Sequence, residues 1–177
     1  RQFLISSERI QKIRMLETLS LWLHSTMTGK VLLTALISML PVVELRGGLP
    51  AGVALGLPIT LSFAASLLGN MLPVPFVILF ARPVFQWVRA HIPALGSFVT
   101  KLETRAYAKS KNVKKYETWG LLIFVAIPLP GTGAWTGALI ASVLNMRLKR
   151  AVPVIFLGVI IAGSIMTVLT YGVSVLL

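Results

Sequence analysis

The sequence has no cysteine and no aspartate, and its 177 residues include only five acidic side chains, all of them glutamates. Without cysteine the chain can form neither a disulfide nor a thiolate site. The two histidines, His24 and His91, lie far apart with no acidic residue beside them. This is more typical of side chains at a membrane surface than of metal ligands, so we expect no metal site and no cofactor.

Charge of both signs is scarce, and most of the chain is apolar. Charged residues make up 12% of the sequence and hydrophobic residues 56%, whereas an ordinary soluble domain carries about 25% charged residues. The net charge of +12 comes from 17 basic residues, many of them in loops between apolar runs. This distribution is typical of cytoplasmic loops beside anionic lipid headgroups rather than of nucleic-acid binding. We predict an integral membrane protein with membrane lipids as partners and no nucleic acid.

The order of apolar runs and breaks predicts one all-α membrane domain, in which a re-entrant helical hairpin plus a transmembrane helix occurs twice, with peripheral amphipathic helices. The expected elements are an amphipathic N-terminal helix in 1–30, a first re-entrant hairpin in 31–57, a transmembrane helix in 59–81, a basic cytoplasmic segment in 82–118, a second re-entrant hairpin in 119–144 and a transmembrane helix in 151–177.

The first hairpin is predicted from helix length. Residues 31–43 carry no charge, but 13 helical residues reach only about 20 Å, short of a hydrocarbon core of about 30 Å. Two glycines and a proline in residues 47–50 follow, and we expect the chain to turn back there. The alternative is one kinked helix over 31–57, although two glycines, a proline and two charges are more disruption than a kink needs.

The second half repeats this pattern. Residues 128–133, with two prolines and two glycines, separate the apolar runs 121–127 and 134–144. Within 59–81, Gly69-Asn70 and Pro73-Val-Pro75 predict a bend or local unwinding. We expect the Asn70 side chain either to hydrogen-bond across a helix interface or to line a cavity.

A shift of 85 residues places Gly48-x-x-x-Gly52 on Gly133-x-x-x-Gly137, and a further slip of 10 places Pro58 on Pro153. Paired broken segments in two halves indicate a transporter site near the bilayer midplane. Residues 82–118 hold eight basic residues and loop 145–150 holds three, out of 17, which predicts that both face the cytoplasm of a plasma-membrane protein. The second hairpin then enters from that side and the first from the other, an inverted repeat. The basic N-terminal helix would lie outside, so its side stays open.

Glu44 is the one acidic residue in a long apolar stretch, and Arg46 lies two residues beyond it. A charge at bilayer depth costs about 2.5–3.5 kcal/mol on insertion scales, so it indicates a functional site. The alternative is a buried ion pair that fixes the hairpin, and the sequence does not decide between the two.

The strings ELRGGLPAGVALG (residues 44–56) and PLPGTGAWTGAL (residues 128–139) resemble the signature segments of the small multidrug export protein family. That family resembles, more distantly, the DedA or SNARE-associated membrane proteins, which have two opposed re-entrant hairpins. The resemblance implies transport of small molecules or of lipid carriers such as undecaprenyl phosphate. Glu44 matches the hairpin glutamate of the DedA proteins. Their second hairpin usually carries arginines, whereas residues 128–137 here have no charge, so Arg46 could fill that role alone.

We therefore expect a DedA-like transporter of a small molecule or an anionic lipid carrier. Because burial disfavours an ionised carboxylate, Glu44 could load and release a proton, and the Arg46 fork suits phosphate. The candidate substrate- or ion-binding residues are Glu44, Arg46, Gly47, Gly48, Pro50, Pro128, Pro130, Gly131, Thr132, Gly133, Trp135 and Thr136. The glycines fit tight turns and close packing better than ligand contact.

The alternative function is a non-transporting scaffold or lipid-organising protein that acts through residues 82–118. The sequence contains no catalytic pairing of side chains that would indicate an enzyme. The Gly-x-x-x-Gly faces suggest a homodimer.

Overall fold

The computed structural model describes residues 14–15, 17–18, 21–114, 117–129 and 131–176. These residues form helices and no strands. The helices are α2 (Met27–Met39), α3 (Glu44–Ala54), α4 (Ile59–Met71), α5 (Val74–His91), α6 (Pro93–Lys114), α7 (Glu117–Ala126), α8 (Ala134–Val143) and α9 (Leu148–Leu176). The predicted N-terminal amphipathic helix falls mostly outside the described residues.

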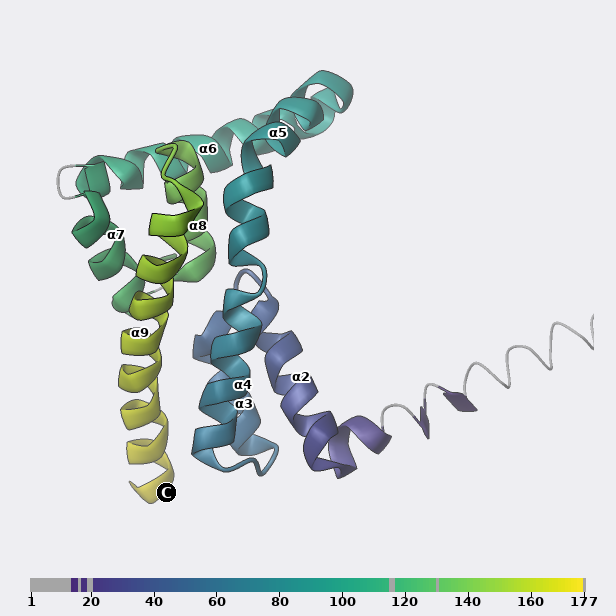
Figure 1. The fold of residues 1–177 in the computed structure, drawn as a ribbon. Helices are drawn as coiled ribbons and strands as arrows, with labels where there is room; N and C mark the ends of the chain where they lie inside the picture. Colours follow the sequence, from purple (N-terminus) through teal and green to yellow (C-terminus); the bar gives the residue numbers. More distant parts are fainter. Residues whose placement is uncertain (1–13, 16, 19–20, 115–116, 130, 177) are drawn as a thin grey trace, which may run out of the picture.

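Two long helical runs extend through most of the height of the molecule (Figure 1). One is formed by α4 and α5, residues Ile59–His91, and the other by α9, of which Leu148–Thr170 is the apolar part. Both are long and apolar enough to cross a membrane. The first run is interrupted at Leu72 and Pro73, which confirms the predicted bend or local unwinding. It continues ten residues beyond the expected end at residue 81, with Pro83 inside α5.

The α2–α3 hairpin occupies the lower half of Figure 1. Thr26 begins α2 by accepting a hydrogen bond from the Gly29 N–H at 3.0 Å. The helix ends at Met39, before Leu40 adopts an extended conformation, as expected for a residue that precedes a proline. The two helices are joined by residues 40–43 and pack against each other, so a single kinked helix over 31–57 is wrong.

The predicted position of the turn, residues 47–50, is also wrong, because these residues lie inside α3. Pro41 supplies the break instead. Gly48 is needed for close packing rather than for a turn: a Cβ on it would overlap the Ser38 hydroxyl of α2. The turn predicted for the second hairpin is confirmed, since α7 ends at Ala126 and α8 begins at Ala134.

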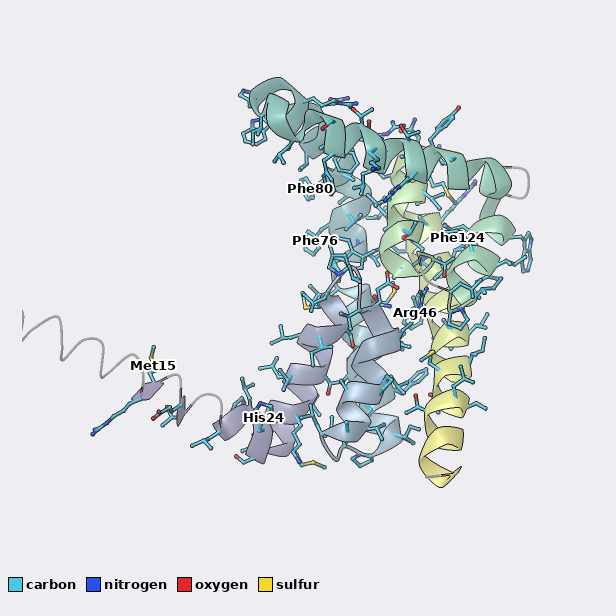
Figure 2. All side chains as sticks on the ribbon, turned by 180° about the vertical axis from the view of Figure 1, so that it is seen from behind. Met15, His24, Arg46, Phe76, Phe80 and Phe124 are labelled. Carbon is cyan, nitrogen blue, oxygen red and sulfur yellow. The ribbon has the colours of Figure 1, made fainter. Side chains whose placement is uncertain are left out.

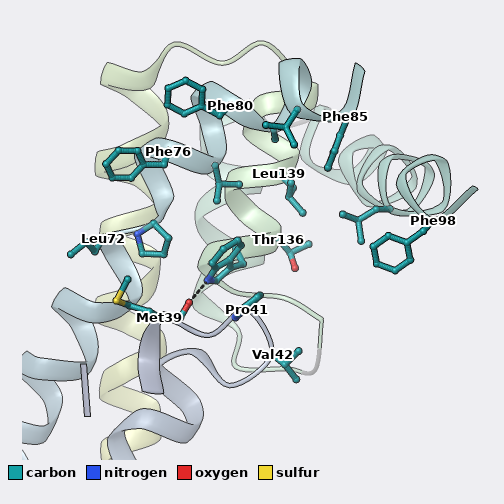
Figure 3. A pocket seen from close by; sticks show the side chains of 16 residues that line it. Met39, Pro41, Val42, Leu72, Phe76, Phe80, Phe85, Phe98, Thr136 and Leu139 are labelled. Atoms are coloured by element: carbon teal, nitrogen blue, oxygen red, sulfur yellow. Dashed lines mark hydrogen bonds between the residues drawn. The ribbon is translucent and has the colours of Figure 1, made fainter. Parts of the chain in front are cut away.

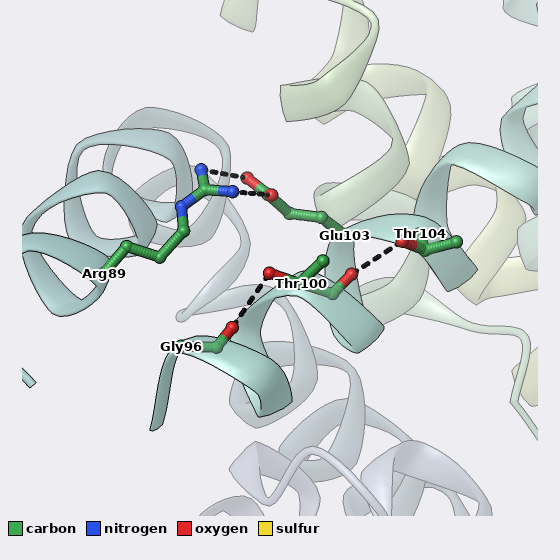
Figure 4. Close-up of polar contacts among 5 residues, drawn as sticks. All are labelled: Arg89, Gly96, Thr100, Glu103 and Thr104. Atoms are coloured by element: carbon green, nitrogen blue, oxygen red, sulfur yellow. Dashed lines mark hydrogen bonds and ion pairs between the residues drawn. The ribbon is translucent and has the colours of Figure 1, made fainter. Parts of the chain in front are cut away.

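The α7–α8 hairpin occupies the upper half of Figure 1, so the two hairpins approach the middle of the molecule from opposite ends. Helix α6 lies across the upper end and packs against α5, α7 and α8. Arg89 of α5 joins it through a two-pronged pair with Glu103, at 2.7 and 3.2 Å (Figure 4). Within α6, Thr100 and Thr104 donate to the carbonyl oxygens one turn earlier.

The two halves share a backbone pattern in which several features recur 89 residues later. Glu44 and Gly133, at the starts of α3 and α8, both have positive φ, at 52° and 106°. Gly56 and Asn145, after the ends of those helices, have φ of 82° and 54°. The following helices begin at Ile59 and Leu148. The shifts of 85 and 95 residues predicted from glycines and prolines are therefore wrong for the backbone. Those glycines are required by local packing contacts, which differ between the two halves.

Large apolar side chains cover the outside of the molecule. Phe76, Leu79 and Val168 are 58%, 53% and 71% exposed, and Figure 2 shows Phe76 and Phe80 pointing outward from α5. Small polar side chains are buried instead, including Thr34, Ser38, Ser62 and Ser66, all at 0%. An apolar exterior of this extent is expected where lipid replaces water.

Candidate functional site

Glu44 is the first residue of α3 and is 4% exposed. Its carboxylate accepts a hydrogen bond from the backbone N–H of Trp135, with 3.0 Å between N and Oε1. Trp135 is the second residue of α8, and the first N–H groups of a helix have no partner within that helix and carry its positive dipole end. Glu44 thus caps a helix of the other hairpin. It is held in the left-handed region, a conformation that costs a non-glycine residue about 1 kcal/mol.

Arg46 binds the turn of the second hairpin. Its guanidinium donates to the carbonyl oxygen of Leu129 and to the Thr132 hydroxyl, the latter at 2.7 Å. Thr132 is itself fixed within the turn, since its hydroxyl lies 2.7 Å from the carbonyl oxygens of Ile127 and Leu129. Glu44 and Arg46 of the first hairpin therefore both make hydrogen bonds to the second, and Figure 2 shows Arg46 at mid-height of the molecule.

Gly133 allows Glu44 and Arg46 to approach the second hairpin this closely. A Cβ at this position would overlap the Glu44 carboxylate and lie 3.0 Å from an Arg46 nitrogen. Its φ of 106° also disfavours any other residue. Only glycine lets the two hairpin tips meet in this way.

The structure brings together five of the residues predicted from sequence: Glu44, Arg46, Thr132, Gly133 and Trp135. Thr136 points into a neighbouring groove. Gly47, Gly48 and Pro50 lie within α3, away from the turn where they were expected. Pro128 and Gly131 belong to the α7–α8 connection, and Pro130 lies outside the described residues.

Asn70, on a third helix, α4, lies beside the contact between the two hairpin tips. It is 2% exposed and lines a small cavity of about 10 Å³ with Glu44, Arg46 and Gly133. The other lining residues are apolar: Leu45, Val125, Ala134, Val159 and Ala162. Of the two roles predicted for Asn70, the structure places it in a cavity.

An apolar groove of about 810 Å³ begins beside this site and runs toward α6 (Figure 3). Met39, Pro41 and Trp135 line it at the hairpin tips, and Phe85 and Phe98 line it near α6. The Trp135 indole N–H donates to the Met39 carbonyl oxygen at 3.0 Å. Trp135 therefore separates the groove from the Glu44 carboxylate, with its ring on one side and its backbone N–H on the other.

The role of Arg82 was not predicted from the sequence. Its guanidinium donates to the Val143 carbonyl oxygen at 2.6 Å and to the Asn145 side-chain oxygen, so it caps the C-terminus of α8 from α5. In the sequence, Arg82 directly follows an apolar run. This position predicts on which side of the membrane the run ends, but not that Arg82 caps a helix.

The Gly-x-x-x-Gly faces are used inside the chain. A Cβ on Gly52 would lie 2.8 to 2.9 Å from Ser62 and Thr34, and one on Gly137 would lie 2.6 Å from Val125. These faces therefore give no support to a homodimer. Within the described part of the chain, no group of three His, Cys, Asp or Glu side chains could hold a metal ion.

The helical fold, the apolar exterior and the two long apolar runs are those of a membrane protein. A family model described as "Putative small multi-drug export protein" matches residues 44–165, from the start of α3 into α9. The chain belongs to this family. Comparison with curated proteins and with solved structures finds no match.

Proposed function

We propose that this protein is a DedA-like transporter that moves a small molecule or an anionic lipid carrier, such as undecaprenyl phosphate, across the plasma membrane in exchange with protons carried by Glu44. The observation that carries this proposal is the meeting of Glu44 and Arg46 with the second hairpin. Two opposite charges lie halfway along a molecule whose outside is apolar, at the place where two opposed hairpins touch.

Helix lengths support a re-entrant arrangement. The arms of the hairpins have 10 to 13 residues, or about 15–20 Å at 1.5 Å per residue, roughly half of the 30 Å hydrocarbon core. Hairpins of this length that enter from opposite faces meet near the midplane. The backbone pattern that recurs after 89 residues supports an inverted repeat, which is common in secondary transporters.

The groove and Arg46 suggest a substrate with two chemically different parts. The groove has the size of small-molecule sites, which typically measure about 300–1,000 Å³, and its lining is almost wholly apolar. Arg46 supplies a planar fork suited to phosphate or carboxylate. A lipophilic body in the groove would bring an anionic group to the hairpin tips, beside Trp135.

Protonation of Glu44 gives a means of coupling. Charge-assisted hydrogen bonds are roughly twice as strong as neutral ones, so a neutral Glu44 would hold the α8 N-terminus less tightly. The hairpin tips could then separate and admit substrate. The excess of basic residues in 82–118 and 145–150 supports a cytoplasmic position for that end of the molecule.

The test is transport in proteoliposomes under an imposed proton gradient, with lipophilic anions and undecaprenyl phosphate as candidate substrates. We expect Glu44→Gln to abolish gradient-dependent transport and Arg46→Ala to reduce it at least tenfold, about the loss of one charged hydrogen bond. Glu103→Gln, which removes a carboxylate from the exposed pair with Arg89, is the matched control and should transport like wild type. Transport that is indifferent to both site substitutions would contradict the proposal.

A second candidate is a non-transporting, lipid-organising protein. The position of α6 favours it: the helix lies across one end of the molecule with Phe98 and Tyr107 exposed, at 62% and 58%, as in helices that rest on a bilayer surface. For this function, Lys101→Glu with Arg105→Glu should abolish activity and Glu44→Gln should leave it unchanged. If the protein is a transporter, Glu44→Gln should abolish activity and the double substitution in α6 should have the smaller effect.

A further inference from the structure

Three buried polar side chains form a row on α4. Ser62, Ser66 and Asn70 follow each other at four-residue intervals, and each is at most 2% exposed. Among the residues that the structure describes, the hydroxyl oxygens of the two serines and the side-chain oxygen of Asn70 have no hydrogen-bond partner. Buried polar groups are nearly always hydrogen-bonded in proteins, often to water, so this row calls for a partner.

The neighbouring helix offers a direct contrast. Ser38 of α2 is equally buried, but its hydroxyl donates to the Thr34 carbonyl oxygen at 2.9 Å, and Thr34 donates to Lys30 at 2.8 Å. Those hydroxyls are satisfied within their own helix. Of the four buried side-chain atoms that have no partner among the described residues, three therefore lie along α4, and the fourth is the Ser142 hydroxyl of α8. Gly52 of α3 adjoins Ser62.

The row leads from one end of the molecule to its middle. Eight residues of helix correspond to about 12 Å, from Ser62, one turn into α4, to Asn70 beside Glu44. The first end lies where α3 and α4 are joined, at the lower end of Figure 1. The second end is the 10 Å³ cavity, which Glu44 and Arg46 line with their charged side chains.

That cavity has room for about one water molecule, which requires roughly 10–15 Å³ and two to four polar partners. Asn70, Glu44 and Arg46 all line the cavity and supply its polar partners. A water held there would satisfy Asn70 and touch the carboxylate.

We propose that this cavity is where Glu44 exchanges protons: Asn70 positions one water molecule against the carboxylate, and Ser66 and Ser62 line the route by which water reaches it. In each exchange, a hydronium ion transfers one proton to a carboxylate oxygen, an O–H bond forms, and a water molecule remains; release is the reverse. The inference rests on the proposed function. With residues 82–118 in the cytoplasm, the route opens to the opposite side of the membrane.

The first experiment uses the absence of cysteine from the sequence. Single variants Ser62→Cys and Ser66→Cys, with Ser38→Cys as the buried control, are reconstituted and treated with 2-aminoethyl methanethiosulfonate, and labelling is followed by intact mass. Thiols react as thiolates, so labelling reports contact with water. We expect the two α4 cysteines to react about tenfold faster than the control, since thiolate reactivity follows access. Equal rates at all three positions overturn the route.

The second experiment measures the pH dependence of transport in Asn70→Leu, which has the branched shape of asparagine but cannot hydrogen-bond to water, and in Asn70→Ser, which remains polar. We expect Asn70→Leu to shift the midpoint of the pH profile by about one unit, a tenfold change in proton affinity, with KM for substrate unchanged. Asn70→Ser should restore the wild-type profile. A wild-type profile in Asn70→Leu overturns the role of Asn70.

The two proposals fail differently. If Glu44→Gln abolishes transport while Asn70→Leu and the labelling pattern show no effect, Glu44 is the proton carrier and its protons arrive by another route. If Glu44→Gln transports normally, the proposed function fails and the route has no proton carrier to serve.

Discussion

The backbone N–H of Trp135 donates to the Glu44 carboxylate at 3.0 Å, although 91 residues separate the two in the sequence. Gly133, at the N-cap of α8, has no side chain that could cap the helix, and Glu44 takes this role from the opposite hairpin. The contact is therefore both a helix cap and the junction of the two halves. Because one carboxylate both caps α8 and joins the two hairpins, its protonation should change how tightly the hairpins pack against each other.

Substitutions at Glu44 should separate these two roles. Glu44→Gln keeps an oxygen that can accept the Trp135 N–H, so it should lower the free energy of unfolding by less than about 1 kcal/mol, the scale of one neutral hydrogen bond. Glu44→Leu leaves the N–H buried without an acceptor and should cost about 1–3 kcal/mol. Thermal unfolding in detergent measures both. Equal stability of the two variants would show that the cap contributes little to the fold.

Gly133→Ala should disrupt the junction without changing any charge. Its Cβ would overlap the Glu44 carboxylate, and alanine is unfavourable at a φ of 106°, so we expect a loss of about 1–3 kcal/mol, as for other strained backbones. Gly96→Ala is the matched control, because no described residue lies within 4 Å of its added Cβ in α6. That change should stabilise the helix by up to about 1 kcal/mol. Comparable melting temperatures for the two variants would contradict the tight contact.

The sequence predicted the elements of the second hairpin better than those of the first, and the reason is physical. Residues 128–133 combine prolines with glycines at positive φ, and no helix can pass through them. In residues 47–50 the same residue types occur for another reason: Gly48 lies against Ser38. Glycine and proline predict a turn in both places, and only the distance to a neighbouring helix distinguishes the cases.

The sequence predicted some residues of the candidate site but not the partners to which they bind. Glu44 and Arg46 could be recognised because a charge inside an apolar run is costly, and Asn70 because an amide in such a run needs a partner or a cavity. Their partners could not be predicted from the sequence, since the Leu129 carbonyl and the Trp135 N–H are backbone groups of a kind that nearly every residue carries. The role of Arg82 depends on where the end of α8 lies in space, which periodicity and composition do not specify.

Arg82 should contribute more to stability than Arg89, although both belong to α5. Arg82 donates to two oxygens at the C-terminus of α8, and Arg82→Ala should cost about 1.5–3 kcal/mol, as expected for hydrogen bonds to a charged group. The Arg89–Glu103 pair has side chains 40% and 27% exposed, and its loss should cost less than about 1 kcal/mol because water and salt screen it. Urea unfolding in detergent at low and high salt measures the difference. A larger loss for Arg89→Ala would contradict this order.

Arg46 should not be replaceable by lysine. Its guanidinium reaches the Leu129 carbonyl and the Thr132 hydroxyl at once, and a lysine ammonium lacks the fork that spans two acceptors. Arg46→Lys should therefore lower transport about tenfold, the equivalent of 1.4 kcal/mol in barrier height. Thr132→Val, which removes the acceptor at nearly constant volume, should have a similar effect, whereas Thr132→Ser keeps the hydroxyl and should transport like wild type. Because Thr132 can act on substrate only through Arg46 and the turn, full activity in Thr132→Val would mean that Arg46 works without being held by the second hairpin.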